Sequence, residues 1–128
     1  MPYKKDGSPL KTGVSLARLT AIEHPTSLDI SWAAGIYEGE GSCGAGGKYR
    51  STFKIQVGQH VRNIWMLEKL KRLFGGSISK RGYSKRENPG EECMREWHIH
   101  GARARGFAMT IFTFLSPYRR EQVKRWLR

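Results

Sequence analysis

The chain has 128 residues, with 23 Lys and Arg against 11 Asp and Glu, and its formal net charge is +12. This length suits one domain with its own core, and a hydrophobic content of 38% argues against a disordered basic tail. A folded surface of this charge indicates a polyanionic partner. Nucleic acid fits better than a membrane, because there is no long basic amphipathic helix and no apolar stretch that could span a bilayer.

Two cysteines, Cys43 and Cys93, are too few for a disulfide framework. They indicate reduced thiols in an intracellular protein, and the compartment stays open between bacterial, phage and organellar. Residues 1–27 carry repeated Pro and Gly without periodicity, so we interpret them as an N-terminal arm before a domain at residues 28–128. The arm is either a DNA-contacting extension or a loosely packed tail.

The first predicted helix follows Ser27, which we expect to cap it. It runs over residues 28–38 and ends in Gly39-Glu40-Gly41, because glycine favours a C-terminal turn. Its small residues Ala33, Ala34 and Gly35 would let another backbone approach closely.

Two strand-like runs come next, a glycine-rich one around 42–48 and an alternating one over 50–57. The alternation predicts an apolar face and a basic, amide-bearing face. The apolar face carries Phe53, Ile55 and Val57 along with Ser51, and the polar face carries Arg50, Thr52, Lys54 and Gln56.

In the rest of the chain, a predicted helix is again followed by two predicted strands, and helices follow these. A helix is predicted over 61–74, strands over 77–83 and 94–100, a helix over 103–115 that Pro117 breaks, and a last helix over 118–127. The order predicts an α+β domain with a four-stranded sheet, helices on one face and the other face open for a ligand. Trp32, Trp65 and Trp97 fall in apolar patterns, so we expect them in the core.

The run Ala33-Ala34-Gly35-Ile36-Tyr37-Glu38-Gly39-Glu40-Gly41 resembles the nine-residue motif that names the LAGLIDADG homing endonucleases. Glu38 and Glu40 fall at its two acidic positions. Two weaker likenesses follow in the family's order: Gln56 to Gln59 before the second helix, and Leu115 to Gln122, where a basic residue stands three before a glutamine. The resemblance covers roughly residues 28–123. It implies the αββαββα fold of that family, with a saddle-shaped antiparallel sheet.

The chemistry of DNA hydrolysis agrees with this resemblance. The reaction needs a water that is activated and a leaving oxygen that is stabilised, and a hard divalent cation has both effects. Such cations prefer carboxylate and carbonyl oxygens as ligands. Glu40 at a helix end, beside Gly39, is a workable half-site. Two chains joined along this helix would bring two Glu40 side chains together, so a single motif implies a homodimer and a near-palindromic target. The expected dimer interface consists of Trp32, Ala34, Gly35 and Glu38.

The resemblance also implies roles for single residues. Glu40 and the carbonyl of Gly39 would bind metal, and Glu38 would support the helix end. Gln59 would orient the attacking water, and Arg119 or Arg120 would stabilise charge at the scissile phosphate. Mg²⁺ is the expected cofactor, with Mn²⁺ as a substitute and Ca²⁺ supporting binding without cleavage.

The polar strand faces are the expected DNA-reading surface, because a two-stranded ribbon fits the major groove. Any single side chain here can equally be a phosphate contact or simply solvated. The candidates for base edges are Arg50, Lys54, Gln56 and Arg81, and those for phosphates are Lys48, Lys80, Lys85 and Arg86. Further candidates for contact with DNA are Thr52, Tyr83 and His98.

The leading hypothesis is therefore a homing endonuclease, or meganuclease, that makes a site-specific double-strand break in DNA by metal-dependent phosphodiester hydrolysis. One alternative is a DNA- or RNA-binding module of the same fold without cleavage, such as a maturase or a regulator. A structural RNA-binding protein is a third. The two acids of the motif favour the enzyme, because without a metal they would only repel a phosphate backbone.

Overall fold

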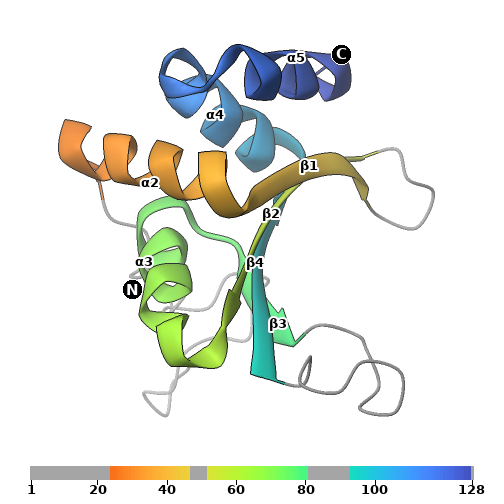
Figure 1. Ribbon diagram of the computed structural model, residues 1–128. Helices are drawn as coiled ribbons and strands as arrows, with labels where there is room; N and C mark the ends of the chain where they lie inside the picture. The colour runs from red at the N-terminus through yellow and green to blue at the C-terminus, as the bar shows by residue number, and fades with distance from the viewer. Residues whose placement is uncertain (1–23, 47–51, 81–92, 128) are drawn as a thin grey trace, which may run out of the picture.

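The computed structural model describes residues 24–46, 52–80 and 93–127. The elements run in the order α2 (Ser27–Glu40), β1 (Gly41–Gly46), β2 (Thr52–His60), α3 (Ile64–Phe74), β3 (Ser77–Lys80), β4 (Met94–His100), α4 (Gly101–Ile111) and α5 (Pro117–Trp126), as Figure 1 shows. Short 3-10 helices at Val61–Asn63 and Phe112–Phe114 follow β2 and α4. The predicted alternation of helices and strand pairs is confirmed.

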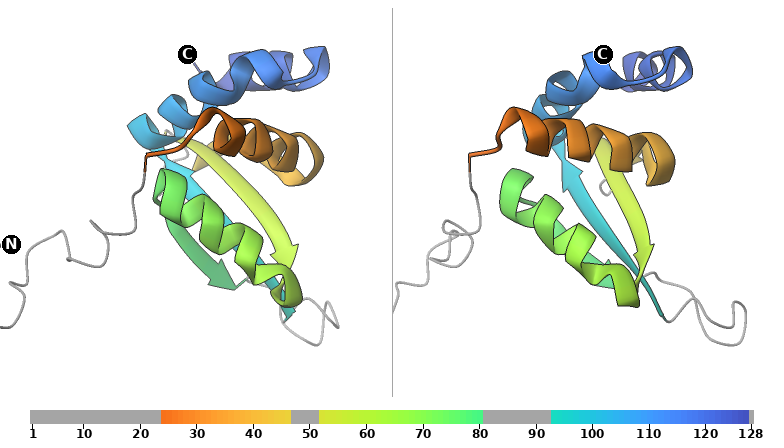
Figure 2. Two further views of the ribbon diagram at one scale, coloured as in Figure 1. Left: turned by 90° about the vertical axis from the view of Figure 1, so that its left-hand side faces the viewer. Right: turned by 60° about the vertical axis from the view of Figure 1, so that its left-hand side comes forward.

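The four described strands form one antiparallel sheet in the order β1-β2-β4-β3. The helices lie on one face of this sheet (Figures 1 and 2). That face carries the apolar residues of the alternating strands, Phe53, Ile55 and Val57 from β2 and Trp97 and Ile99 from β4, all at most 3% exposed. The α+β class and its single covered sheet face are therefore as predicted.

The opposite sheet face, here the outer face, carries the polar partners of the same alternation. The register sets Gln56 opposite His98 and Lys54 opposite His100, and sets Ser77 opposite His98 on the other side of β4. The side chains of the outer face include Ser42 of β1, Thr52, Lys54 and Gln56 of β2, Ser77 and Ser79 of β3, and Glu96, His98 and His100 of β4.

The motif helix α2 is closed at both ends by local hydrogen bonds. Its cap is Thr26 rather than Ser27: the Asp29 N–H donates to Thr26 Oγ1 at 3.2 Å, and the Thr26 N–H donates to Asp29 Oδ2 at 2.9 Å. The acid three residues after Thr26 completes this reciprocal pair, which Ser27 could not form. The helix ends at Glu40 as predicted. The Gly41 N–H donates to the carbonyl of Tyr37, and a Cβ on Gly41 would collide with the Tyr37 ring.

The tryptophans separate into three environments. Trp97 is fully buried, and its indole N–H donates to the Gly75 carbonyl at 2.8 Å. Trp32 is partly buried, but Trp65 is 55% exposed, so its predicted place in the core was wrong. The buried side of α3 follows Leu67 and Leu70, and a residue two positions before Leu67 points away from that side.

Several element boundaries differ from prediction. The helix expected over 103–115 is α4 at Gly101–Ile111, and the 3-10 helix Phe112–Phe114 follows it. The strand expected to end at residue 57 continues to His60, and the next helix opens as a 3-10 turn before α3 begins at Ile64. Pro117 begins α5 rather than merely ending α4, because its ring suits the first helical position. None of the helices in the described ranges is long and apolar enough to cross a membrane.

Candidate active site and nucleic-acid interface

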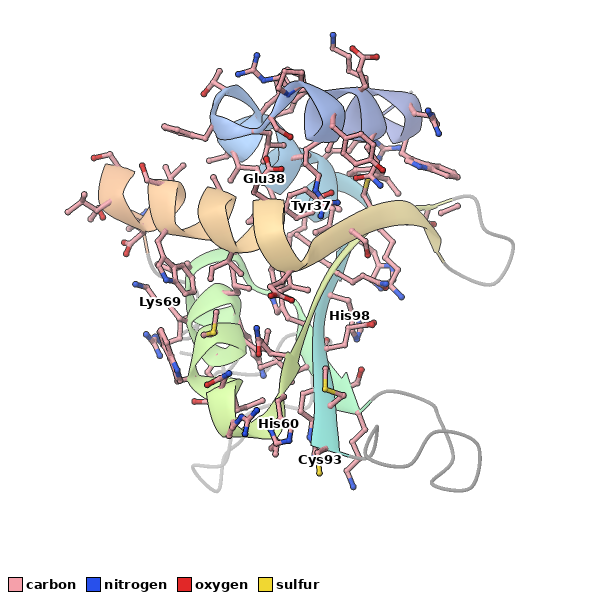
Figure 3. All side chains as sticks on the ribbon, in the orientation of Figure 1. Tyr37, Glu38, His60, Lys69, Cys93 and His98 are labelled. Atoms are coloured by element: carbon pink, nitrogen blue, oxygen red, sulfur yellow. The ribbon has the colours of Figure 1, made fainter. Side chains whose placement is uncertain are left out.

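The C-terminal end of α2 meets the N-terminal end of α5 through Glu38 (Figure 3). The Glu38 carboxylate accepts hydrogen bonds from the Ser116 N–H at 2.7 Å and from the Ser116 hydroxyl at 2.9 Å. The backbone hydrogen bond from Ser116 is the main reason why the pKa of Glu38 lies below its usual value. Glu38 therefore fastens α5 to the end of the motif helix.

Arg119 completes the same junction from the first turn of α5. Its Nε and Nη2 donate to the main-chain carbonyl of Glu38 at 3.2 and 3.1 Å, and its Nη1 donates to Gln122 Oε1 at 2.8 Å. The side chain is 15% exposed, with the guanidinium 5.5 Å from the centre of the Tyr37 ring. Of the two candidate arginines, this one lies at the end of α2.

The neighbouring Arg120 takes a different direction. Its Nε donates to the Phe112 carbonyl at 3.2 Å and its Nη2 donates to the Thr113 carbonyl at 2.7 Å. Arg120 therefore binds the chain between α4 and α5, and the geometry gives the position beside the motif to Arg119 alone.

Glu40 is the last residue of α2 and is exposed. Within the described ranges, its carboxylate has no hydrogen bond or ion pair. The last carbonyls of a helix lack intrahelical donors, and the carbonyl of Gly39 is one of them. Carboxylate and carbonyl oxygens are the ligands that a hard cation such as Mg²⁺ prefers. Among the described residues, no group of three or more Asp, Glu, His or Cys side chains that could hold a metal ion occurs.

The glycines of α2 present bare backbone at the surface. Gly35 and Gly39 are exposed, and a Cβ built on either would meet no atom within 4 Å. Glycine inside a helix costs about 1 kcal/mol relative to alanine, and nothing in the described protomer requires it at these two positions.

Other residues expected in the dimer interface have partners inside the protomer. Ala34 is 3% exposed and belongs to the core of this chain, so its side chain has little surface left for a second copy. The Trp32 ring lies 6.2 Å from the Trp65 ring, with the Lys69 ammonium 4.4 Å from its centre. Glu38 is engaged with Ser116, as described above.

Gln59 lies near the end of β2 at the start of the following turn. The register pairs Gln59 with Arg95, so strand alternation places Gln59 on the same sheet face as Val57 and not on the face of Gln56. Its amide oxygen accepts from the His60 N–H and from Asn63 Nδ2, both at 3.2 Å. These contacts brace the turn that leads to α3, and none of them ties Gln59 to the end of α2.

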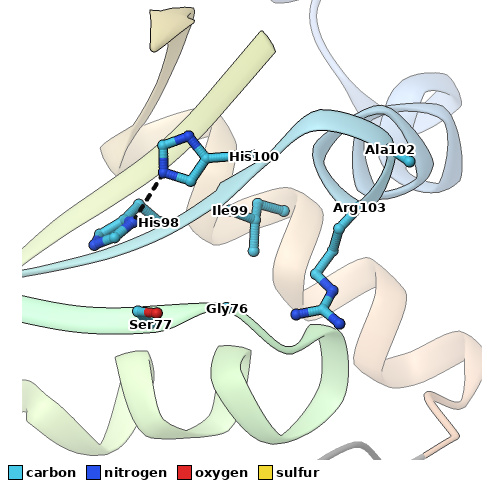
Figure 4. A pocket seen from close by; sticks show the side chains of 7 residues that line it. All are labelled: Gly76, Ser77, His98, Ile99, His100, Ala102 and Arg103. Atoms are coloured by element: carbon cyan, nitrogen blue, oxygen red, sulfur yellow. Dashed lines mark hydrogen bonds between the residues drawn. The ribbon is translucent and has the colours of Figure 1, made fainter. Parts of the chain in front are cut away.

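The outer face gathers donors and acceptors on neighbouring strands. His98 Nδ1 lies 3.3 Å from His100 Nε2, and both rings line a pocket of about 350 Å³ with Ser77 and Arg103 (Figure 4). Burial, followed by the nearby Lys54 ammonium, lowers the pKa of His98.

Sequence reasoning placed Lys54, Gln56 and His98 on this face, and it did not name Glu96 or His100 among the DNA contacts. The period-two alternation of 94–100 sets both of them on the same face as His98.

The remaining DNA candidates are only partly testable. Thr52 lies on the outer face as expected. Lys80 pairs with Arg95 and lies on the same sheet face as Ile78, which is opposite to the face of His98. Six further candidates, Lys48, Arg50, Arg81, Tyr83, Lys85 and Arg86, lie outside the described residues, as does most of the predicted N-terminal arm.

No protein-family model and no curated protein matches the sequence. Solved structures do match. The homing endonuclease I-CvuI, in complex with its target in the presence of Ca, has a TM-score of 0.59 at 20% identity, over 78% of this chain and 64% of that one. The group I intron-encoded homing endonuclease I-CeuI, complexed with DNA, also has a TM-score of 0.59 at 20% identity, over 87% and 58%.

The LAGLIDADG homing endonuclease I-LtrWI, bound to target DNA, has a TM-score of 0.58 at 13% identity, over 95% of this chain and 40% of that one. The chain thus spans less than two thirds of the length of each of these enzymes. The fold implied by the nine-residue motif is confirmed: this chain has the fold of the LAGLIDADG homing endonucleases.

Proposed function

We propose that the protein is a site-specific DNA endonuclease that acts as a homodimer and hydrolyses phosphodiester bonds with Mg²⁺. The observation that carries the proposal is the end of α2. There Glu40 ends the helix, exposed and without a hydrogen bond or ion pair to any described residue, while Arg119 is fixed on the carbonyl of Glu38, two residues earlier. The outer face of the sheet that follows α2 is polar and open. The DNA complexes of the structural neighbours support double-stranded DNA as the substrate.

The exposed glycines support dimerisation along α2. Gly35 and Gly39 leave room for a second backbone, and their helical cost is offset if a copy of the same helix packs there. A two-fold axis between two such helices brings the two Glu40 carboxylates to the centre of the assembly. This symmetry predicts a palindromic or near-palindromic target.

Glu40 and the Gly39 carbonyl would hold the metal, with the second copy supplying the matching ligands. Mn²⁺ should substitute for Mg²⁺, whereas Ca²⁺ should support binding without cleavage. The bound ion supplies an acidified water and charge stabilisation at the leaving oxygen.

Arg119 uses three of its five N–H donors in hydrogen bonds with described residues, and the other two would stabilise the charge that develops on the scissile phosphate. Gln59 would orient the attacking water through its amide nitrogen.

DNA would lie across the outer face, where Lys54 and Gln56 are suited to guanine and adenine edges and Thr52 and His98 flank them. The described part of this face is mixed rather than uniformly basic. The net charge of +12 therefore serves general attraction to the duplex, and the outer face serves discrimination.

The test is selection followed by cleavage. Random duplexes are bound in Ca²⁺, recovered, and then exposed to Mg²⁺. Near-palindromic sites that are cut on both strands support the endonuclease. Selected sites that stay intact in Mg²⁺ and Mn²⁺ would instead support a binding module of the same fold, and failure to select any duplex would contradict both.

A further inference from the structure

Glu96 is the only acidic residue on the four described strands, and it lies on the outer face. Its neighbours Trp97 and Ile99 fill the core, so strand alternation turns Glu96 and His98 to the open side. A carboxylate on a surface that approaches DNA is electrostatically unfavourable. The fold does not need it there, because the side chain makes no contribution to the core. Its place is better explained by what the outer face recognises.

The Glu96 carboxylate is paired with a base-reading candidate. Lys54 Nζ lies 3.7 Å from Glu96 Oε1, and the two side chains are 29% and 18% exposed. The register pairs Lys54 with His100, four residues after Glu96 on β4, so the Lys54 side chain extends along the sheet past His98. An ion pair that is partly shielded and longer than a hydrogen bond contributes little to stability. It does, however, set a cationic donor and an anionic acceptor side by side on an open surface.

This donor–acceptor couple matches one base pair. In the major groove, a G·C pair offers the guanine O6 and N7 acceptors beside the cytosine N4 donor. In an A·T pair, the purine instead presents the N7 acceptor and the N6 donor. Lysine donates to guanine O6 and N7, and glutamate accepts from cytosine N4. We propose that Lys54 and Glu96 together read one G·C base pair in each half of the target, which makes Glu96 a specificity-determining residue. The inference rests on the proposed DNA-binding function.

Two consequences separate this role from a structural one. Glu96 repels phosphates at any sequence without a donor in the right place, so it should weaken binding to non-target DNA. Without it, Lys54 is free to contact phosphates, so discrimination should fall while general affinity rises. A residue that only braced the sheet would lower both.

The test compares Glu96→Gln with Glu121→Gln. Both changes remove one negative charge. However, Glu121 is an exposed residue of α5, paired with Lys124 at 3.4 Å, on the helix side of the sheet. Each variant is put through duplex selection in Ca²⁺ and titrated against one selected site and one scrambled duplex over a range of salt. Thermal unfolding of each free protein checks that the fold is retained.

The wild type should select a G·C pair at one symmetric pair of positions. Glu96→Gln should lose about 5- to 150-fold of the preference there, bind the scrambled duplex more tightly, and depend more steeply on salt. Glu121→Gln should keep the wild-type preference. Lys54→Met should lose the preference at the same position while binding all duplexes more weakly.

An unchanged preference in Glu96→Gln, or losses at different positions in the Glu96 and Lys54 variants, would overturn the inference and leave the proposed function standing. A wild-type protein that selects no duplex would overturn both.

Discussion

The guanidinium of Arg119 donates two hydrogen bonds to the main-chain carbonyl of Glu38, through Nε at 3.2 Å and Nη2 at 3.1 Å. The last carbonyls of a helix carry partial negative charge, and a cation at this end is stabilising. The contact joins α5 to α2, fixes the arginine at the end of the motif, and leaves Arg120 to bind elsewhere.

The two arginines should therefore differ in function. Arg119→Met should lower the single-turnover rate of DNA cleavage by about 100-fold, because the proposed function uses this fixed cation to stabilise charge at the scissile phosphate. Arg120→Met should stay within a few-fold of the wild type. Rates are measured at saturating protein, with denaturant unfolding of both variants as a control. Equal losses in the two variants would contradict the assignment.

The contact between Glu38 and Ser116 predicts a pH-dependent stability. The pKa of Glu38 is lowered, mainly by the Ser116 N–H, so the stabilisation is complete above the ordinary Glu pKa of 4.5 and is lost as the pH falls through the lowered value. Glu38→Gln should unfold about 1 kcal/mol more easily near neutral pH, a modest cost because solvent screens a side chain that is 37% exposed. Urea unfolding is measured from neutral to strongly acidic pH. A difference in the free energy of unfolding between the wild type and Glu38→Gln that stays constant well below pH 4.5 would contradict this assignment.

The hydroxyl of Tyr37 is buried without a well-formed hydrogen bond to any described residue, and burial raises the pKa of Tyr37. Removing an unsatisfied buried hydroxyl relieves a desolvation cost. Tyr37→Phe should therefore leave the free energy of unfolding unchanged or raise it by up to about 1 kcal/mol. Denaturant unfolding checks this, and a loss of more than about 1 kcal/mol would reveal a hydrogen bond to the hydroxyl.

A substitution at Gly35 should have opposite effects on the stability of the protomer and on dimerisation. A methyl group there meets nothing in the protomer, so Gly35→Ala should stabilise an isolated protomer by up to about 1 kcal/mol through helix propensity. The same methyl group should weaken a dimer that packs along α2. Sedimentation equilibrium measures association, and unfolding at low concentration measures protomer stability. Gly41→Ala is the contrasting variant and should be strongly destabilised, because its Cβ would collide with Tyr37.

The sequence was sufficient for most of the architecture because the patterns involved are local. Alternation placed Phe53, Ile55 and Val57 on the covered sheet face, and glycine placed the end of α2 at Glu40. The cap was misplaced by one residue because Thr26 and Ser27 are both good cap residues. Only the acid three positions after Thr26 distinguishes them.

The geometry of the site was harder to predict from the sequence, because it depends on contacts between segments that are distant in the chain. Arg119 and Arg120 are equivalent by composition, and only the contact with Glu38, about eighty positions earlier in the chain, separates them. Ala34 was predicted in the dimer interface because small residues suit close backbone approach. Small residues equally suit a helix that packs tightly on its own sheet, and only the fold decides between these uses. Trp65 was misplaced because hydrophobicity alone does not say which side of a helix faces the core.

If Glu40 binds the metal ion on which cleavage depends, its carboxylate is needed for cleavage of DNA but not for binding. Cleavage of a selected duplex is followed in Mg²⁺, and binding to the same duplex is followed in Ca²⁺, for the wild type, Glu40→Gln and the charge-matched surface variant Glu121→Gln. Glu40→Gln should lose cleavage by at least about 100-fold and keep sequence-specific binding, while Glu121→Gln should behave as the wild type. Full cleavage by Glu40→Gln, or cleavage by the wild type in the presence of excess EDTA, would contradict this role of Glu40.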